Sequence, residues 1–426
     1  MITVLLTISG FILFLFLLWK YPFWRTATSI TVFLLLLSAV VGLLADSTFY
    51  KTYVEPQSTV LSDFDDTDFL TSKRAYKTED RIVIVNIGNQ NREEIANQIE
   101  WISKYRPKVI ALDVLFPYNK DSAMDARLAR AIERAGNVVM VSSLGSRTEQ
   151  GFGSVNTSIP EFSRFATHGY STFPTQPGLN EVSRLCRSLY PQVVVNGKRE
   201  LAFATAVAMA YDSSRTKEFL ERGQAEELIN YSYNLYDSDS TNQPIRVLDF
   251  DLSDIPDSVA MSFKDKIVLF GFLGEYIGAE SLSDMFFTPL NKKPGGTRNP
   301  DMFGIIVHAN IISMILDRHY ISAPSPWLTN ILNFLLCLLH ISLLLFVRDR
   351  WPRGFDLIAT VIIIGQIAGL TYMRMQLFEH YNLKLFFGVS VATLAIAGIA
   401  INIYLELIPY LGQKLRLSKG PQTSSN

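Results

Sequence analysis

Two aspartates stand close together in the sequence and are the first candidates for chemistry. Asp113 lies near the end of the apolar run 109–114, and Asp121 is the first residue of a helical pattern over residues 121–135. Carboxylates that the fold brings together can act as an acid–base pair. Each residue also has a structural interpretation, because Asp113 can anchor the loop that follows it and Asp121 can cap the helix. The sequence alone leaves both interpretations open.

Small and polar residues end two further apolar runs. Asn86 and Asn89 follow one run, and Gly271 and Gly274 follow the other. The segment Gly-Phe-Leu-Gly stands where a phosphate-binding turn would, but it matches neither the dinucleotide-binding pattern nor the Walker pattern. A glycine turn that serves the backbone alone is the alternative.

His308 lies among apolar neighbours in the last helical pattern of the central region, over residues 302–320. A metal site on a helix would show a second ligand three or four residues away, and His308 has none at that spacing. We therefore expect either a hydrogen-bonded core histidine or a residue that binds a ligand.

Two acidic stretches resemble calcium-binding loops only in part. Residues 237–241 begin with the correct alternation, but Asn242 stands where glycine is required and Leu248 where a bidentate glutamate is required. The stretch 63–68 lacks that spacing altogether, and a solvated helix face is its alternative. The sequence also contains no nucleophile-elbow motif. We expect no metal, no cofactor and no enzymatic activity.

The segment from Asp80 to Pro117 supplies the elements that position these residues. Residues 81–87 are β-branched and apolar, which predicts a buried strand. Asn91 can cap a helix that runs to Tyr105, and a second buried strand follows over residues 109–114. Two strands joined by a helix make a right-handed βαβ unit with a parallel sheet. Asn86, Asn89 and Asp113 would then lie at the carboxyl ends of adjacent strands, where α/β sheets bind ligands.

The pattern of strands and helices continues to residue 320 and predicts an α/β fold with a mainly parallel sheet and an antiparallel edge. Residues 143–180 are rich in turn-forming residues and read as an insertion. The expected helices are 121–135, 200–211, 215–222 and 302–320. The expected strands are 137–142, 184–195, 227–236, 245–250 and 263–272, with a tight turn at Asn196-Gly197.

Five apolar segments are long enough, or nearly so, to cross a membrane as helices. They are residues 2–18, 26–45, 327–347, 355–373 and 385–405. A secretory signal is the competing interpretation of the first segment, but it lacks a basic start and a cleavage site, so we expect a retained span.

The distribution of basic residues predicts how these helices are oriented. Lys and Arg concentrate in residues 20–25, in residues 348–353 and in the C-terminal tail, which the positive-inside rule places in the cytoplasm. We expect two transmembrane helices in residues 1–45, an outer domain in residues 46–326, three transmembrane helices in residues 327–408 and a polar cytoplasmic tail in residues 409–426.

The formal charge of -1 gives no indication of a nucleic-acid partner. The two cysteines, Cys186 and Cys337, fall in the outer domain and in a predicted transmembrane helix. We expect them not to pair, so the outer domain depends on its hydrophobic core.

Several motifs in the outer domain resemble those of the CHASE type 2 sensor domain over roughly residues 50–322. The motifs are RIVIVNIG at 81–88, KVIALDVLFP at 108–117, FKDKIVLFGF at 263–272, the turn Phe287-Thr288-Pro289 and the segment 303–310, which is similar to a closing Pro-Gly-x-x-x-His-Ala-Asn motif. The resemblance implies an extracytoplasmic domain that senses a stimulus and signals through three membrane helices. The chain departs from the family pattern in two respects. Asn86 or Asn89 replaces the usual acidic residue, and only residues 409–426 follow the last helix, where a kinase or cyclase is usual.

The sequence therefore predicts a sensor in a bacterial inner membrane that binds a small ligand or an envelope protein and acts on a separate effector. An envelope scaffold that docks through residues 143–180 is the alternative, and a hydrolase that uses Asp113 and His308 is a third hypothesis. The predicted ligand-binding residues lie at strand ends and on the last helix of the outer domain. They are Asn86, Asn89, Asp113, Gly271, Gly274, Thr288 and His308.

Overall fold

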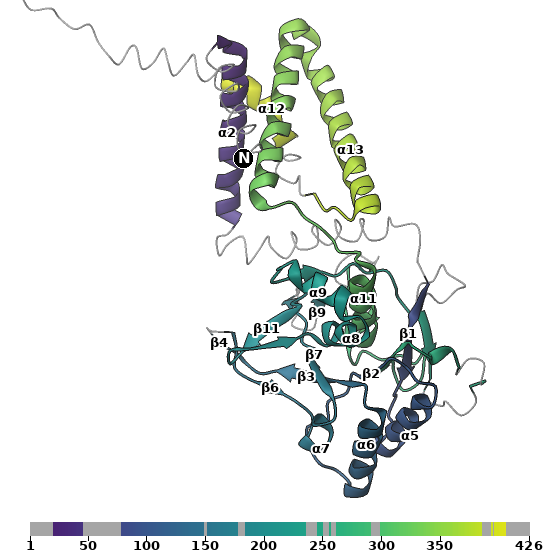
Figure 1. The fold of residues 1–426 in the computed structure, drawn as a ribbon. Helices are drawn as coiled ribbons and strands as arrows, with labels where there is room; N and C mark the ends of the chain where they lie inside the picture. The colour runs from purple at the N-terminus through teal and green to yellow at the C-terminus, as the bar shows by residue number, and fades with distance from the viewer. Residues whose placement is uncertain are drawn as a thin grey trace, which may run out of the picture. The chain divides into compact units, whose positions relative to one another are not determined.

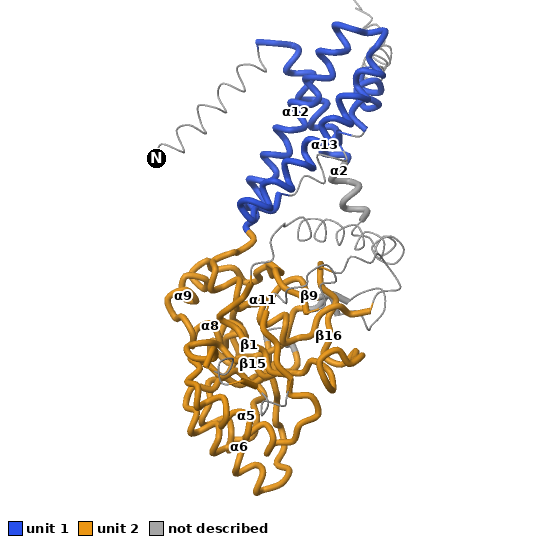
Figure 2. The backbone as a smooth tube through the Cα atoms, turned by 90° about the vertical axis from the view of Figure 1, so that its right-hand side faces the viewer, with its two compact units in different colours: residues 1–55, 322–426 blue, residues 56–321 orange. Residues whose placement is uncertain are grey.

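The computed structural model divides the chain into two compact units (Figure 2). One unit contains residues 1–55 and 322–426, and the other contains residues 56–321. The structure describes residues 20–45, 78–148, 151–177, 184–235, 245–249, 255–256, 261–290, 299–385, 393–394 and 396–405. The acidic stretch 63–68, the calcium-like loop 237–241 and the first predicted span, 2–18, lie outside the described residues.

The unit 56–321 is built on a seven-stranded sheet (Figure 1). The strands lie in the order β14-β1-β15-β2-β3, and β6 and β7 both pair with β3. All pairs are parallel except β3 with β6. The strand bounds are β1 Glu79–Asn86, β2 Val109–Leu112, β3 Val138–Leu144, β6 Val155–Asn156, β7 Thr167–Tyr170, β14 Ile245–Leu248 and β15 Ile267–Gly271. The prediction of a mainly parallel α/β sheet is confirmed.

The order of the central strands differs from the prediction. β1 and β2 are not neighbours, because β15 lies between them and pairs with both. Every residue of β15 is buried. All three strands are short apolar runs without a polar face, and such runs do not specify which strand lies beside which. The strand predicted at 245–250 lies at one edge of the sheet as β14, where it pairs in parallel with β1, and the antiparallel pairing is between β3 and β6.

Helices cover both faces of the sheet (Figure 1). On one face, α5 Arg92–Ser103 and α6 Ser122–Ala135 pack on alternate strand residues such as Val83 and Val85. On the other face lie α8 Phe203–Tyr211 and α11 Gly304–Asp317, which contact each other and the central strands. All the residues of α11 from Gly304 to Leu316 are buried. The result is a sheet enclosed between two helical layers.

The helix ends follow the predicted capping chemistry. The Asn91 side chain accepts hydrogen bonds from the amides of Glu93 and Glu94, and the Glu94 carboxylate accepts one from the Asn91 amide, so α5 begins with a capping box. Asp121 accepts from the amides of Ala123 and Met124 at the start of α6.

Two predicted strands are replaced by shorter pieces. Residues 184–195 form β9 Arg184–Cys186, β10 Ser188–Leu189 and β11 Gln192–Val195, and the turn at Asn196-Gly197 leads into β12 Lys198–Leu201 as predicted. In the described part of the predicted strand 227–236, residues 227–235, the only strand is β13 Glu227–Leu228. The Asn310 side chain of α11 instead accepts hydrogen bonds from the amides of Ser232 and Tyr233, at 2.7 and 2.9 Å. A side chain therefore takes the place of a neighbouring strand.

The remaining described elements of this unit are short. They are β4 Arg147–Thr148, β5 Gly151–Phe152, α7 Pro160–Ser163, β8 Thr175–Pro177, α9 Ser213–Glu221, β16 Met285–Phe286, β17 Met302–Phe303 and the 3-10 helix Met261–Phe263. The insertion predicted at residues 143–180 contains several of them.

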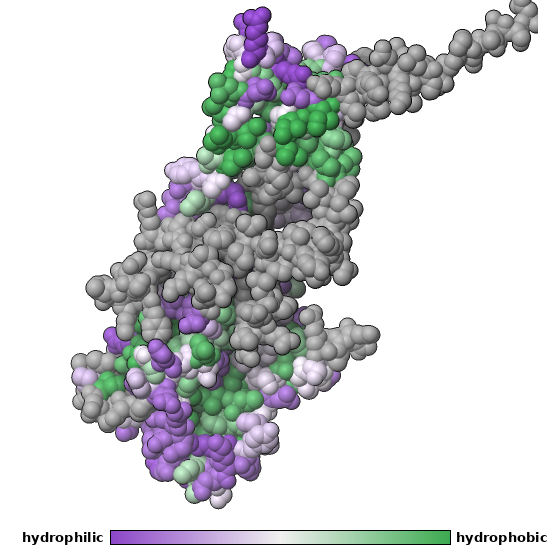
Figure 3. All heavy atoms as spheres, turned by 180° about the vertical axis from the view of Figure 1, so that it is seen from behind, coloured by the Kyte–Doolittle hydropathy of each residue, from purple (hydrophilic) through white to green (hydrophobic). Residues whose placement is uncertain are grey.

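The other unit is helical. Its described helices include α2 Pro22–Ala45, α12 Pro326–Arg350 and α13 Phe355–Tyr381. Two helices, Pro326–Arg350 and Pro352–Tyr381, are long and apolar enough to cross a membrane, and Pro22–Leu37 and Ile396–Leu405 are shorter apolar helices. Apolar side chains gather on the surface of this unit (Figure 3). The predicted segments 327–347 and 355–373 fall within the two long helices.

A buried ion pair joins α5 to α6. Arg92 and Asp125 pair with only 7% and 9% of their side chains exposed. Arg92 also donates to the Tyr118 carbonyl at 2.5 Å, and the Asp125 carboxylate accepts from the Lys120 amide at 2.9 Å. The pair therefore also fixes the loop that follows β2.

We expect Asp125→Asn to lower the free energy of unfolding by about 3–5 kcal/mol, because it leaves a buried cation without its counter-ion. The control is Glu93→Gln, which breaks the pair between Glu93 and Arg127 on the same two helices, where the side chains are 43% and 40% exposed. That change should cost less than about 1 kcal/mol. Hydrogen exchange of the α6 amides in the full-length protein measures both, and equal losses would contradict the prediction.

Candidate functional site

The carboxyl edge of the sheet, where β1, β15 and β2 end, contains two topological switch points. α5 and α6, which follow β1 and β2, lie on one face, whereas α11, the helix that follows β15, lies on the other. Sheets of this kind bind ligands at such points. The main chain continues the pairing there, because the Asp113 amide donates to the Phe270 carbonyl at 2.8 Å.

Asn86 closes the switch point between β1 and β15. Its side-chain oxygen accepts from the amides of Leu273 and Gly88, at 2.8 and 3.1 Å. Its side-chain nitrogen donates to Asp249 at 3.0 Å and to the Gly274 carbonyl at 3.2 Å. These four hydrogen bonds use the capacity of a side-chain amide, and Asn86 is fully buried. Asn86 therefore ties three strand ends together.

Asn89 has a different environment from Asn86. It lies exposed in the turn that follows β1. The structure does not bring it together with Asp113 or His308 in any described contact.

The two predicted glycines serve the backbone. A Cβ atom on Gly271 would lie 2.6 Å from the Ile305 side chain, so glycine lets α11 approach the end of β15. Gly274 adopts a positive φ of 100°, which favours glycine. The close approach of α11 is the structural alternative to a phosphate-binding turn at this position.

Thr288 anchors a loop. Its amide donates to Asp301 at 2.7 Å, and its hydroxyl donates to the other oxygen of the same carboxylate at 2.5 Å. Because this pair of bonds occupies the donors of Thr288, the residue fixes the chain ahead of α11.

Asp113 lies deep in the domain although part of its surface remains accessible. Burial, and secondly the charge of Asp284, raise the pKa of Asp113 to about 8. Asp121 is not the partner that was considered from the sequence, because its carboxylate caps α6. The Asp284 carbonyl accepts the Gly304 amide at 2.9 Å, and its carboxylate oxygens lie 3.0 and 3.1 Å from the place that a Cβ atom on Gly304 would take. Two carboxyl groups therefore lie near the first turn of α11.

His308 lies in the second turn of α11 among aromatic rings. The ring centroids of Phe173 and Phe203 lie 4.7 and 5.0 Å from its own. Only 2% of His308 is exposed, and among the described residues its Nδ1 atom has no hydrogen-bond partner. Burial lowers its pKa to about 3, so the ring is neutral near neutral pH.

Comparison with known proteins places the chain in a family. The model of the CHASE2 domain matches residues 28–347. The chain belongs to the CHASE2 family. No curated protein and no solved structure matches it. CHASE2 is an extracytoplasmic sensor domain, and the match confirms the resemblance found in the sequence and extends it into α2 and α12.

The CHASE2 domain thus presents a defined set of groups at its carboxyl edge. A protonated Asp113 can donate a hydrogen bond, while Asp284 can accept one or attract a cation. Exposed apolar side chains occur on the loops after β2 and β15, with Tyr118, Tyr276 and Leu282 exposed by 75%, 58% and 68%. Within the described residues, no group of three His, Cys, Asp or Glu side chains is placed to hold a metal ion.

Sequence reasoning missed Asp284, Asp249 and Arg92. Asp284 lies in a polar loop with no motif around it, and Asp249 lies within the predicted strand 245–250. Arg92 is the first residue of α5, next to the helix cap, where a charged residue is normally solvated. The one sign of its burial in the sequence was Asp125, an opposite charge in the first turn of the next helix. These residues act through contacts between distant segments.

We expect the stability of the CHASE2 domain to depend on pH through Asp113. Its pKa rises from 3.8 to about 8, so the folded state keeps a proton that the unfolded state loses, and stability falls as pH rises through this window. Below pH 6.5, His308 has the opposite effect on stability. Its imidazole binds a proton in the unfolded chain but stays neutral in the folded domain, so stability falls as pH falls. Between pH 6.5 and 8 the loss should therefore be about 1–2 kcal/mol.

The variant Asp113→Asn should abolish this loss of stability. Asp284→Asn should reduce the loss, because the charge of Asp284 is one of the two causes of the raised pKa of Asp113. Hydrogen exchange of the β2 amides in the full-length protein, corrected for the intrinsic effect of pH, measures the slope. An Asp113→Asn slope equal to that of the wild type would show that another group titrates.

Proposed function

We propose that this CHASE2 protein is a membrane-anchored sensor whose outer domain binds a small ligand at the carboxyl edge. One observation carries the proposal: α11 connects this edge to the opposite edge of the sheet. Its first turn contacts Gly271 and Asp284, and its last turn holds the start of β1. A displacement at the site therefore has a continuous helix through which to act.

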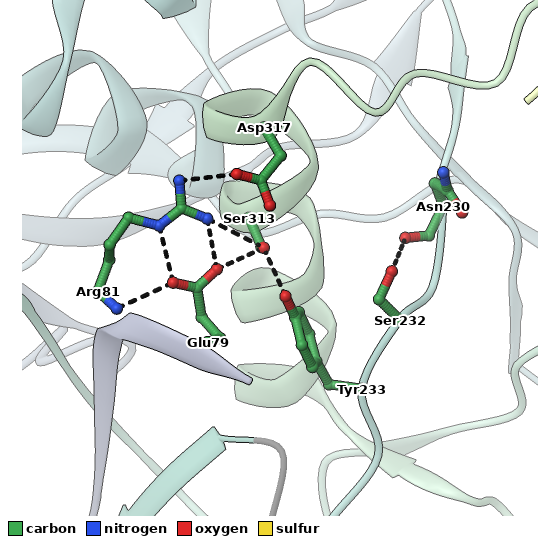
Figure 4. A network of polar contacts seen from close by, with 7 residues as sticks. All are labelled: Glu79, Arg81, Asn230, Ser232, Tyr233, Ser313 and Asp317. Carbon is green, nitrogen blue, oxygen red and sulfur yellow. Dashed lines mark hydrogen bonds and ion pairs between the residues drawn. The ribbon is translucent and has the colours of Figure 1, made fainter. Parts of the chain in front are cut away.

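The far end of α11 is held by a polar network (Figure 4). Arg81 pairs with Glu79 at 2.6 Å and with Asp317 at 3.0 Å. The Ser313 hydroxyl donates to Glu79 at 2.5 Å and lies 3.0 Å from the Tyr233 hydroxyl. Burial alone would raise the pKa of Glu79, but hydrogen bonds from Arg81 and Ser313 outweigh it and lower that pKa. These contacts make the end of α11 and the start of β1 move together.

The chemistry of the site favours a ligand that is polar or cationic and has an apolar part. Asp284 supplies a carboxylate, the protonated Asp113 supplies a donor, and the loops supply exposed apolar groups. Asn89 lies exposed on the turn after β1, and Phe173 packs against His308, but no described contact joins them to Asp113 or Asp284. A small molecule or a segment of an envelope protein could present such groups.

The proposal assigns binding, and not turnover, to these residues. A general acid or base works best with a pKa near the working pH, and the pKa of Asp113, about 8, meets this condition, whereas that of His308 does not. His308 is held neutral with a pKa of about 3, which makes it a poor carrier of protons near neutral pH. The hydrolase hypothesis would need a change in the surroundings of His308.

The arrangement in the membrane is also part of the proposal. It places residues 46–326 outside the cytoplasm of a bacterial cell, between two spans in residues 1–45 and three in residues 327–408. The basic loops 20–25 and 348–353 and the tail 409–426 would then lie inside. Signalling would act on a separate effector in the membrane or the cytoplasm.

An envelope scaffold is the second candidate. It is favoured by a separate four-stranded sheet, β12-β11-β5-β4, that arises partly from the predicted insertion. Val194 in β11 exposes 56% of its surface, which suits a contact with a protein. Stable co-purification of a partner that is lost on Val194→Asp would favour this function.

Ligand binding can be tested on the purified full-length protein. Incubation with the low-molecular-weight metabolite pool of cells, followed by native mass spectrometry, should show a retained species. Asp284→Asn should lose it, because the carboxylate is removed, whereas Glu280→Gln, an exposed acid on the same loop, should keep it. Retention that is the same in both variants would place the site elsewhere.

Coupling through α11 can be tested with Gly271→Ala. The added methyl group would overlap Ile305 and force the first turn of α11 to move. We expect altered hydrogen exchange in residues 318–330, which follow α11 and begin α12. The control Ile132→Val removes one methylene from the buried side of α6, which covers the opposite face of the sheet. It should lower the free energy of unfolding by ~0.5–1.5 kcal/mol. An equal change in the control would show general destabilisation, and no change in Gly271→Ala would contradict the proposed coupling.

A further inference from the structure

The amino edge of the sheet, where β1, β15 and β2 begin, carries a cluster of cations. Two loops supply most of them, and main-chain hydrogen bonds join these loops: the Lys108 amide donates to the Lys266 carbonyl at 2.8 Å, and the Asp265 amide donates to the Arg106 carbonyl at 3.2 Å. We call this cluster the basic edge. Its members are Lys104, Arg106, Lys108, Arg246, Lys264 and Lys266.

The charges of the basic edge are not neutralised within the described residues. None of its six members forms an ion pair there; Arg246 donates to the Ser262 hydroxyl, and the Lys108 ammonium lies 4.7 Å from the centre of the Tyr211 ring. The neighbouring acids Glu79 and Asp317 are already engaged by Arg81. Among the described residues, the exposed acids beside the basic edge are Asp80 and Asp265, which its cations outnumber.

A cavity of about 200 Å³ opens at this edge. Arg246 and Lys266 line it together with Thr78, Glu79, Asp80, Ile82 and Val83. The Glu79 carboxylate is already paired with Arg81, so an anionic group that enters the cavity would meet Arg246 of β14 and Lys266, which precedes β15, beside the carboxylate of Asp80. The cavity gives the basic edge a place where a headgroup can be held as well as attracted.

The chain also leaves the outer domain at this edge. The last turn of α11 is fixed to the start of β1 through Asp317 and Arg81, at 3.0 Å. Residues 322–325 alone separate Ile321 from Pro326, the first residue of α12, and five links of extended chain span at most ~18 Å. α12 is long and apolar enough to cross a membrane, and Trp327 at its start is 65% exposed, as suits a headgroup layer.

We infer that the basic edge is a docking surface for the anionic phospholipid headgroups of the membrane that holds the chain. The charge of the edge, its cavity and its short tether to α12 select this occupant. Each lysine near an anionic surface strengthens such binding about fivefold. The inference goes beyond the sensor function, because it requires no ligand at the carboxyl edge.

The test uses the full-length protein in lipid nanodiscs of two compositions, phosphatidylcholine alone and phosphatidylcholine with phosphatidylglycerol. Lysines are labelled with a water-soluble acylating reagent and counted by mass spectrometry. Phosphatidylglycerol should lower the labelling of Lys264 and Lys266 severalfold, and higher ionic strength should restore it. Lys198, whose side chain is 79% exposed on a hairpin away from this edge, should be labelled equally in both.

A charge variant sharpens the test. Lys104→Gln combined with Lys264→Gln should weaken the protection of Lys266 by about fivefold for each charge removed. Lys198→Gln is the matched control and should leave that protection unchanged. Both variants alter exposed side chains, so neither should prevent folding.

Three outcomes would overturn the inference. Equal labelling in the two lipid compositions would remove the role of anionic lipid. Protection by inorganic phosphate in phosphatidylcholine nanodiscs would identify a soluble anion as the occupant. Protection that is lost in either lipid when Asp63, Asp65, Asp66 and Asp68 are changed to Asn would identify the chain's own acidic stretch as the cover.

Discussion

The packing of α11 against β1 and β15 is the contact on which the outer domain depends. The helix is buried from Gly304 to Leu316, so the sheet and α8 must form around it. Glycine at position 271 permits the close approach at one end, and the pairing of Arg81 with Asp317 fixes the other. A helix held at both ends in this way is a rigid link between the two edges of the sheet.

The polar groups of the domain are divided between the two edges that α11 connects. Asp113 and Asp284 lie near its first turn, and cations that form no ion pair within the described residues lie near the start of β1. Burial decides what these groups can do. Asp113 keeps its proton and His308 stays neutral, so both offer hydrogen bonds rather than charge, whereas most lysines of the amino edge are exposed to solvent.

Local signals allowed much of the fold to be predicted from the sequence. The capping box at Asn91, the cap at Asp121 and the apolar periodicity of α11 each depend on residues within one or two turns. The strand order could not be predicted, because three apolar runs of similar composition carry no information on which lies beside which. The segment after residue 227 was predicted as a strand from its alternation, but Asn310, far away in the sequence, satisfies its backbone instead.

The position of β15 bears on how the domain is made. Its neighbours β1 and β2 are synthesised early, yet neither pairs with the other, and the strand that joins them comes near the end of the domain. Contacts between such distant segments slow folding, because a long loop must close before they form. The central part of the sheet can therefore be completed only after almost the whole domain has been synthesised.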